Sequence, residues 1–319
     1  MKRGAWAAFW LVALIWGSSF LLIRIGLLGF GLFSAEAGAH AGFRTAEIVF
    51  VRTFIAALGL GAVIALRRVP LPRDWRTWRA LVIIGLGNVV APFLLITWSE
   101  QYITSGLAAV LQSTAALFTL VIAHFTFADE RISLQKIIGL LLGFVGVIVL
   151  FGGEMGGENS VAGMFGMVLA SLCYATFTSY SRRVIQGDVA PIVVAGVTIS
   201  VAAIATAPLA LLGEGGFTPL AQVSSDALVS VIVLGLLNTF VAYLFYYFIV
   251  RELGAARASM VTYVVPVVGV ILGAIFLQEV VGLTLLLGGG MIFAGIAIVN
   301  LRRRQRVRLA QAVEQGAKS

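Results

Sequence analysis

Residues 105–150 read SGLAAVLQSTAALFTLVIAHFTFADERISLQKIIGLLLGFVGVIVL, and this segment indicates how the whole chain is built. It is an apolar run, a short charged interruption, and a second apolar run that contains several glycines. Residues 254–299 repeat this arrangement as GAARASMVTYVVPVVGVILGAIFLQEVVGLTLLLGGGMIFAGIAIV. At a constant offset of 149 residues, Glu130 corresponds to Glu279. A repeat of this length predicts that the chain contains two copies of one structural unit.

The composition predicts a membrane protein. Of the 319 residues, 60% are hydrophobic and 11% are charged, and the mean hydropathy is +1.04. Soluble domains carry about 25% charged residues, so the surrounding solvent here is expected to be lipid. The net charge of +8 would suit nucleic acid in a soluble protein. Because the basic residues lie in short loops between apolar runs, we expect no nucleic-acid partner.

Ten apolar segments are long enough to cross a bilayer, which takes about 20 residues each. The first apolar run follows Lys2 and Arg3 and is about 25 residues long, too long for a signal peptide. We therefore expect it to be retained as the first span. The predicted spans are 5–28, 46–66, 79–98, 104–127, 132–151, 161–182, 189–212, 227–250, 256–277 and 281–301.

The distribution of basic residues predicts the orientation. With ten spans, 19 of the 22 Lys and Arg residues fall at the N-terminus, in alternate loops and in the C-terminal tail. Of the other three, Arg44 lies in an opposite loop, and Arg24 and Arg52 lie inside spans. Since positive loops stay in the cytoplasm, both termini are predicted to be cytoplasmic, in a bacterial inner membrane.

Five spans in each copy is an odd number, so the second copy is expected to enter the membrane upside down. Inverted repeats of this kind are common in secondary transporters, with the substrate site between the repeats. The predicted fold is therefore an all-α membrane protein with ten transmembrane helices as two inverted five-helix repeats around a central cavity. The boundaries are 1–152 for the first repeat, 153–301 for the second, and 302–319 for a basic cytoplasmic tail.

Polar side chains inside spans are costly in lipid and normally face the bundle interior or a water-filled cavity. Pro266 also frees the backbone carbonyl four residues earlier, at Thr262. For Asn88 and Asn238, interhelical hydrogen bonding and substrate contact both stay open, and for Arg52 a cavity-facing and an ion-paired role stay open. The candidate substrate-binding residues are Trp16, Arg52, Asn88, Trp98, Gln112, Tyr174, Asn238, Tyr243, Thr262, Tyr263 and Pro266.

The sequence lacks the residues that several other classes of membrane protein need. No Asp or Glu lies in the middle of a span, which disfavours a pump driven by a deep carboxylate. The chain contains no GxxxxGKS or HExxH motif, and its single cysteine and two distant histidines make a metal cluster improbable. We expect no enzyme activity, no catalytic or metal-ligating residue and no cofactor.

Glycines recur in the fifth and tenth spans, where they let helix backbones approach closely. These spans are expected to contact other helices and to lie outside the substrate path. The glycines are Gly139, Gly143, Gly146, Gly288, Gly289, Gly290 and Gly295.

The chain resembles a known family at WGSSF in the first span (16–20), at Arg52, and in the two long repeated stretches. These look like the two EamA domains of the drug/metabolite transporter superfamily. The resemblance covers nearly the whole chain and implies spans 1–4 and 6–9 around a cavity, with spans 5 and 10 outside. Related proteins often have WGSN in place of WGSSF, and the loop of about 17 residues after the first span is also a departure.

The resemblance and the polar inventory together predict the function. We expect a secondary transporter that exports small metabolites by alternating access, with aromatic or other neutral amino acids as the closest substrates. The alternative is a flippase for a lipid-linked carrier, or another metabolite or drug permease of the same fold. The expected partners are a small-molecule substrate and membrane lipid, with the chain a monomer or weak homodimer.

Overall fold

The computed structural model describes residues 2–29, 42–127, 133–154, 159–185, 189–213 and 216–316, and this part of the chain contains helices and no strand. The long loop after the first predicted span and the turn at Glu130 lie outside these residues. The helices are α1 (Lys2–Leu28), α2 (Thr45–Leu66), α3 (Trp75–Gly85), η1 (Leu86–Val90), α4 (Ala91–Ser99), α5 (Ser105–Gln112), α6 (Ala115–Thr126), α7 (Leu134–Glu154), α8 (Val161–Val184), α9 (Pro191–Leu211), η2 (Leu220–Gln222), α10 (Ser225–Gly235), η3 (Leu236–Val241), α11 (Ala242–Leu253), α12 (Ala255–Ala258), α13 (Val261–Phe276) and α14 (Leu283–Gly316).

Eight helical stretches in the described residues are long and apolar enough to cross a membrane. Two shorter apolar helices, Val261–Phe276 and Leu283–Val299, complete the set. All ten predicted segments are therefore helical, while the count of ten crossings and the inversion stay predictions. The eight stretches are Arg3–Leu28, Thr45–Leu66, Trp75–Ser99, Ser105–Thr126, Leu134–Gly153, Val161–Val184, Pro191–Leu211 and Ser225–Leu253.

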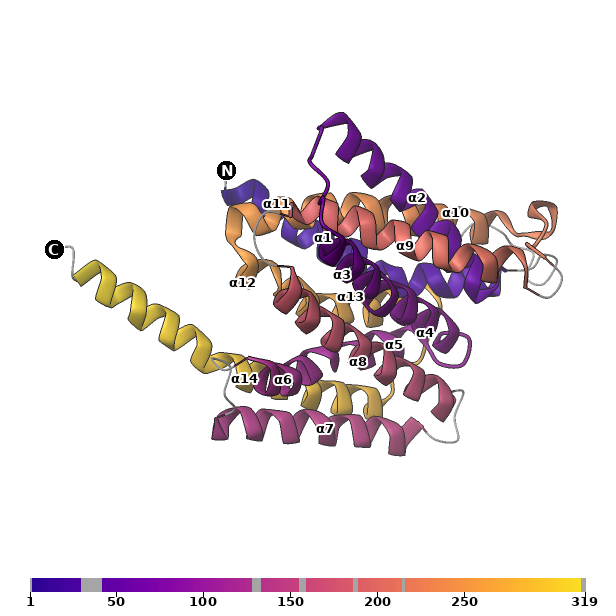
Figure 1. Cartoon of the computed structure of the whole chain (residues 1–319). Coiled ribbons are helices and arrows are strands. Elements are labelled where there is room, and N and C mark those ends of the chain that lie inside the picture. Colours follow the sequence, from indigo (N-terminus) through magenta and orange to yellow (C-terminus); the bar gives the residue numbers. More distant parts are fainter. Residues whose placement is uncertain are drawn as a thin grey trace.

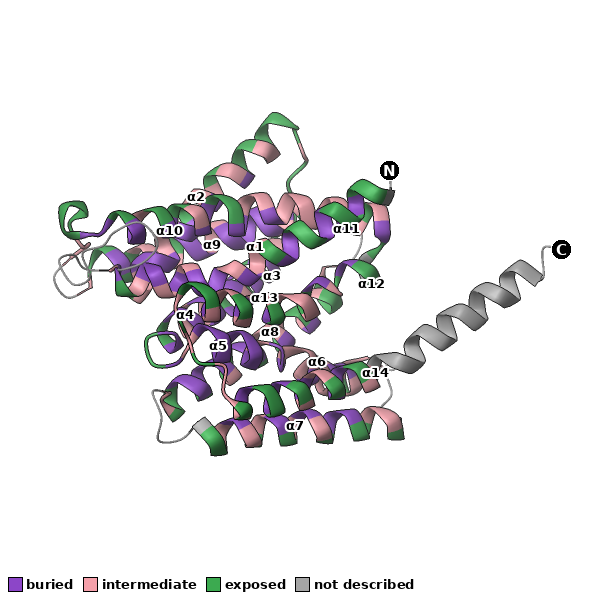
Figure 2. Cartoon of the chain, turned by 180° about the vertical axis from the view of Figure 1, so that it is seen from behind, coloured by how far each residue is buried: buried purple, intermediate pink, exposed green. Residues whose placement is uncertain are grey.

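The arrangement of the helices places both chain ends on the same side of the molecule (Figure 1). The start of α1 and the end of α14 lie at one end of the bundle, which we call the terminal end. The beginnings of α2 and α10 lie toward the other end, which we call the distal end. Exposed residues lie along the outside of the bundle (Figure 2). Many of them are apolar, such as Ile148 and Ile204. Exposed apolar residues along the outside of the bundle indicate contact with lipid.

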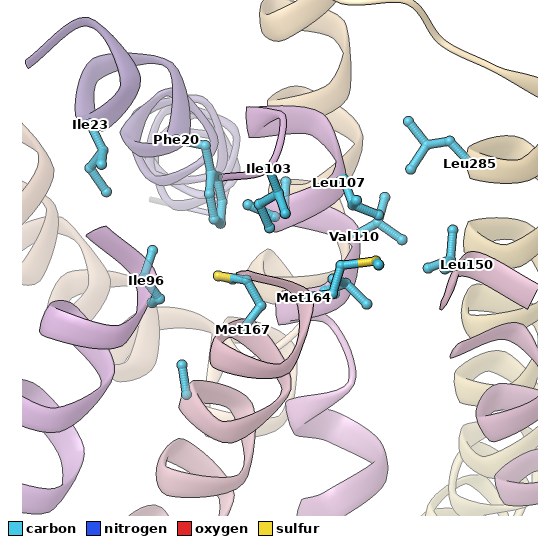
Figure 3. Packing of buried hydrophobic residues seen from close by; sticks show 14 of the residues in the cluster. Phe20, Ile23, Ile96, Ile103, Leu107, Val110, Leu150, Met164, Met167 and Leu285 are labelled. Atoms are coloured by element: carbon cyan, nitrogen blue, oxygen red, sulfur yellow. The ribbon is translucent and has the colours of Figure 1, made fainter. Parts of the chain in front are cut away.

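The largest buried cluster joins the two halves of the chain. Figure 3 shows Phe20 of α1, Ile96 of α4 and Leu107 of α5 near Met164 and Met167 of α8. Leu107, Met164 and Met167 are at most 1% exposed. Because lipid tails are as apolar as these side chains, such packing stabilises the bundle through close contact rather than through the hydrophobic effect.

Helices α7 and α14 run side by side at one edge of the bundle (Figure 1). A methyl group added at Gly146 would lie 2.6 Å from the Gly288 carbonyl oxygen, and one added at Gly139 would lie 2.6 Å from the Gly295 oxygen. Only glycine allows two helix backbones to approach this closely. The predicted role of these glycines as helix–helix contacts is confirmed, except at Gly290, where an added methyl group would meet nothing within 4 Å.

The same local irregularity occurs in both halves. The α-helix widens to a π-helix at η1, around Asn88, and at η3, around Asn238. The sequences are GLGN at 85–88 and GLLN at 235–238. A π-helical turn inserts a residue into the helical ladder and is frequent at functional sites. The first π-helix separates α3 from α4, and the second separates α10 from α11.

Candidate functional site

A cavity of about 1190 Å³ lies between the helices. Its wall includes residues of α1, α2, α4, α5, α6, α8, α11 and α13. The lining extends to Lys136, Arg182 and Ser259 at the terminal end. It does not include Glu47, Glu100 or Glu279 at the distal end. The cavity is thus built asymmetrically, reaching one end of the bundle and stopping short of the other.

Aromatic side chains form one part of the wall. The ring centroid of Trp16 lies 5.2 Å from that of Tyr246 and 6.3 Å from that of Tyr243. Tyr243 in turn lies 6.1 Å from Tyr247. Rings held at tilted or edge-on angles in this range attract one another. Of these rings, Trp16, Tyr243 and Tyr246 line the cavity and present a surface on which an aromatic or apolar group can pack.

A positive charge faces the cavity from α2. Arg52 lines the cavity and is 8% exposed. Its Nε donates a hydrogen bond of 2.8 Å to Thr239 Oγ1, and its guanidinium carbon lies 4.1 Å from the centre of the Phe93 ring. Thr239 lies in the π-helix η3, and its Oγ1 donates in turn to the carbonyl oxygen of Leu234, five residues earlier in α10. The π-helix therefore helps to hold Arg52 at the wall.

Two amide side chains of the wall have unused acceptors. Asn238 Nδ2 donates to the Ile15 carbonyl oxygen and, at 3.1 Å, to the hydroxyls of Ser18 and Ser19. Asn238 Oδ1 and Gln112 Oε1 are buried and have no hydrogen-bond partner in the described part of the chain. Both side chains line the cavity. Because a buried polar atom without a partner is costly, each is a natural acceptor for a donor on a bound molecule.

Nine of the eleven predicted residues line this one cavity. Asn88 and Trp98 are not among the lining residues; Asn88 accepts a hydrogen bond of 3.2 Å from Thr178, and Trp98 packs against Tyr102. A substrate role for these two stays a prediction without support from the cavity. The nine are Trp16, Arg52, Gln112, Tyr174, Asn238, Tyr243, Thr262, Tyr263 and Pro266.

The cavity also contains residues that were not predicted from the sequence. Phe93 and Ile96 are apolar residues in apolar helices, so no sequence signal marks them. Tyr246 could have been found, since it lies three residues after Tyr243 on the same helix. The cavity wall also includes Lys136 of α7 and Val299 of α14. Residues of both helices therefore line the cavity at its terminal end, which differs from the expectation that the two spans lie outside the substrate path.

Hydrogen bonds join distant segments at the distal end. The Glu279 carboxylate, which follows α13, accepts hydrogen bonds from the Ser105 amide at 2.7 Å and the Gly106 amide at 2.9 Å. The Glu47 carboxylate of α2 accepts from the amide and the hydroxyl of Thr218 at 2.7 and 2.9 Å, and pairs with Arg44 at 2.7 Å. A carboxylate near a helix N-terminus is stabilised by the helix dipole, and its hydrogen bonds to a charged donor are stronger than neutral ones. These contacts tie together segments that are distant in the sequence.

The sequence of the chain matches the model of the EamA-like transporter family twice, over residues 3–152 and 161–301. The chain belongs to this family. The match confirms the resemblance to EamA domains, and it identifies the protein as a membrane transporter of the drug/metabolite transporter superfamily.

Individual relatives of this EamA-like transporter are similar over their whole length. A protein of Archaeoglobus fulgidus described as an uncharacterized transporter is 27% identical over 95% of this chain and 100% of its own. A probable terminal-alkyne amino-acid exporter of Streptantibioticus cattleyicolor is 26% identical over 97% of both chains. A solved crystal structure matches with a TM-score of 0.61 at 19% identity, covering 94% of this chain and 98% of the other. That likeness shows a shared fold.

Proposed function

We propose that this EamA-like transporter exports amino acids, with neutral and aromatic ones as the best substrates. The observation that carries the proposal is one cavity lined by Arg52, by an aromatic cluster around Trp16, and by two amide side chains whose oxygens have no partner among the described residues. The relative named as a probable terminal-alkyne amino-acid exporter supports the same substrate class. A flippase for lipid-linked carriers or another metabolite permease of the same fold is the alternative.

The carboxylate, ammonium group and side chain of an amino acid each have a matching group in the cavity wall. A guanidinium binds a carboxylate through paired, charge-assisted hydrogen bonds, which assigns the substrate carboxylate to Arg52. An ammonium group has three donors, and Gln112 Oε1 and Asn238 Oδ1 are acceptors that need donors. The substrate side chain would then pack on Trp16 and its neighbouring tyrosines, where aromatic contacts are favourable. A neutral amino acid leaves no further charge to satisfy.

The direction of transport follows from the predicted orientation. If both termini are cytoplasmic, the terminal end of the cavity faces the cytoplasm and the distal end faces outward. In this arrangement the cavity collects substrate from inside the cell while the Glu279 and Glu47 contacts hold the outer end closed. Export by alternating access requires these contacts to part while the terminal end closes. Ten spans in two inverted repeats would make the two movements related by symmetry.

The test is transport by the purified chain in liposomes. Labelled phenylalanine, leucine, glutamate and lysine are offered to vesicles loaded with each unlabelled amino acid, and exchange is measured. We expect exchange of the neutral amino acids to exceed that of the charged ones. Exchange of none of them, by protein that is correctly inserted, would overturn the proposal. Movement of a fluorescent lipid across the same bilayer would favour the flippase.

A further inference from the structure

The side chain of Glu100 is a buried carboxyl that has no role in substrate binding as proposed above. Glu100 follows α4 directly at the distal end, and it is 0% exposed. Both of its carboxyl oxygens are buried and have no hydrogen-bond partner among the described residues. By contrast, the distal-end carboxylates Glu47 and Glu279 each accept hydrogen bonds on both oxygens. Glu100 is therefore a distal-end carboxyl that the contacts of Glu47 and Glu279 do not explain.

The charged groups that face Glu100 come from three elements. Arg24 of α1 is the cation with the largest electrostatic effect on the Glu100 carboxyl. Its Nη1, however, donates to the backbone carbonyl oxygens of Glu100 and Ile103, at 2.8 Å for Ile103. Glu279 adds a negative charge from the segment after α13, and Arg52 of α2 adds a positive charge while bonded to Thr239. Helix α8 approaches this level through Gly163, which is uncharged. None of these groups hydrogen-bonds the carboxyl.

Physical chemistry favours the neutral form of such a carboxyl. An ionised carboxylate without hydrogen bonds is strongly destabilised when it is removed from water. Burial raises the pKa of Glu100 well above its ordinary value, and the opposing effects of Arg24 and Arg52 are smaller. A protonated carboxyl carries no charge and is compatible with this site. The site is thus suited to hold a proton in the closed arrangement.

We propose that the Glu100 carboxyl is a proton-binding site that controls the distal end, protonated while that end is closed and ionised when it opens to water. This inference rests on the alternating-access function proposed above. Opening must separate α1, the segment around Ile103 and the segment that carries Glu279. Water would then reach the carboxyl, lower its pKa and release the proton. Since the closed state has the higher proton affinity, low pH favours the closed state and rising pH favours opening.

The first experiment detects the proton directly and does not depend on transport. Infrared difference spectra of the reconstituted full chain are recorded during a pH titration, in water and in deuterium oxide. We expect a protonated-carboxyl band that persists above the pH at which exposed carboxyls ionise, that shifts in deuterium oxide, and that is missing in Glu100→Gln. Asp74→Asn, in an exposed carboxyl that caps α3, is the control and should keep the band. A missing wild-type band, or one retained in Glu100→Gln, would overturn the proposal.

The second experiment measures control of opening. Amino-acid exchange is measured with equal pH on both sides, so that no gradient drives flux. We expect the wild-type rate to rise with pH, and Glu100→Gln to be at least several-fold slower and independent of pH. A pH profile that is the same in both proteins would contradict the proposal. If the infrared band is present but no amino acid is exchanged, the proton site stands and the substrate assignment fails. If amino acids are exchanged but the infrared band is missing, the proton site fails and the substrate assignment stands.

Discussion

Glu279 Oε1 accepts a hydrogen bond of 2.7 Å from the backbone amide of Ser105, which lies 174 residues earlier in the chain. Oε2 of the same carboxylate accepts from the Ser105 hydroxyl at 3.0 Å and from the Gly106 amide at 2.9 Å. The carboxylate thus caps the N-terminus of α5 from the segment between α13 and α14. One side chain satisfies helix donors that would otherwise lack partners in a membrane.

This contact predicts the effect of Glu279→Gln. The amide keeps its size but loses the negative charge and one acceptor, so a charged hydrogen-bond network becomes partly unsatisfied. We expect a loss of about 1–3 kcal/mol in stability, measured as a lower thermal unfolding midpoint of the purified protein. Glu252→Gln is the control, because Glu252 pairs with the exposed Arg251 at 3.4 Å, and exposed pairs contribute about 0–1 kcal/mol. Equal midpoints for the two variants would show that the cap does not stabilise the fold.

The glycine contacts between α7 and α14 predict a strong dependence on side-chain size. A Cβ at Gly288 would lie 2.9 Å from the Gly146 carbonyl oxygen and closer still to Leu150, whereas one at Gly290 would meet nothing within 4 Å. Gly288→Leu should therefore force the two helices apart and lower the yield of folded protein. Gly290→Leu, two residues away on the same helix, should be tolerated. Size-exclusion profiles of the two variants make the comparison.

The cavity acceptor predicts that Gln112→Ala lowers amino-acid exchange without lowering stability. Removing a buried oxygen that has no partner leaves no new unsatisfied group in the protein. The bound substrate, however, loses an acceptor for its ammonium group. Exchange rates and unfolding midpoints are measured on the same preparation. A parallel loss of both would indicate a structural role in place of a binding role.

The aromatic wall predicts that Trp16→Ala weakens exchange of aromatic amino acids more than of alanine. Trp16 contacts Tyr243 and Tyr246, so the substitution removes the largest ring from the surface on which such a side chain would pack. Trp75→Ala is the matched control, since Trp75 is 75% exposed. Equal losses for alanine and phenylalanine would remove the basis for an aromatic preference.

The planar guanidinium predicts that Arg52→Lys is not a conservative change. Lysine keeps the charge but loses the fork that can bind a carboxylate and Thr239 together. Charged hydrogen bonds contribute about 1.5–3 kcal/mol, so we expect the half-saturating amino-acid concentration to rise by about tenfold or more. Arg251→Lys on the surface should leave it unchanged. An unaltered value in Arg52→Lys would place the substrate carboxylate elsewhere.

The raised pKa of Glu100 predicts how its contribution to stability depends on pH. The folded state binds the proton more tightly than the unfolded state, in which a glutamate has a pKa of about 4.3. The contribution is therefore fully present below that value and is lost as pH rises toward the folded-state pKa. Wild type should lose thermal stability relative to Glu100→Gln as pH increases over this window. A constant difference between the two proteins would exclude titration of Glu100 there.

Much of the fold and of the site was predictable because lipid imposes simple rules on a sequence. Runs of about 20 apolar residues must be helical, since no other open structure satisfies its backbone in a bilayer. Polar residues within those runs must face inward, and for this reason Trp16, Arg52 and Gln112 converge on one cavity. The rule does not say how deep along the bundle each residue lies. Asn88 and Trp98 are polar or amphipathic residues of the same helical stretch, yet they lie outside the cavity lining.

The apolar runs, the glycine spacing and the duplicated motifs are enough to identify a helical membrane transporter of the EamA-like family with a polar interior. Which end the cavity reaches, and which carboxylates have partners, depends on how the helices pack in three dimensions. Glu47, Glu100 and Glu279 all lie at the ends of predicted spans, and position alone suggests the same environment for each. Two are satisfied by donors from distant segments, and Glu100 is buried without one. Hydrogen-bond partners that are 171 and 173 residues apart are set by helix packing, which no local pattern records.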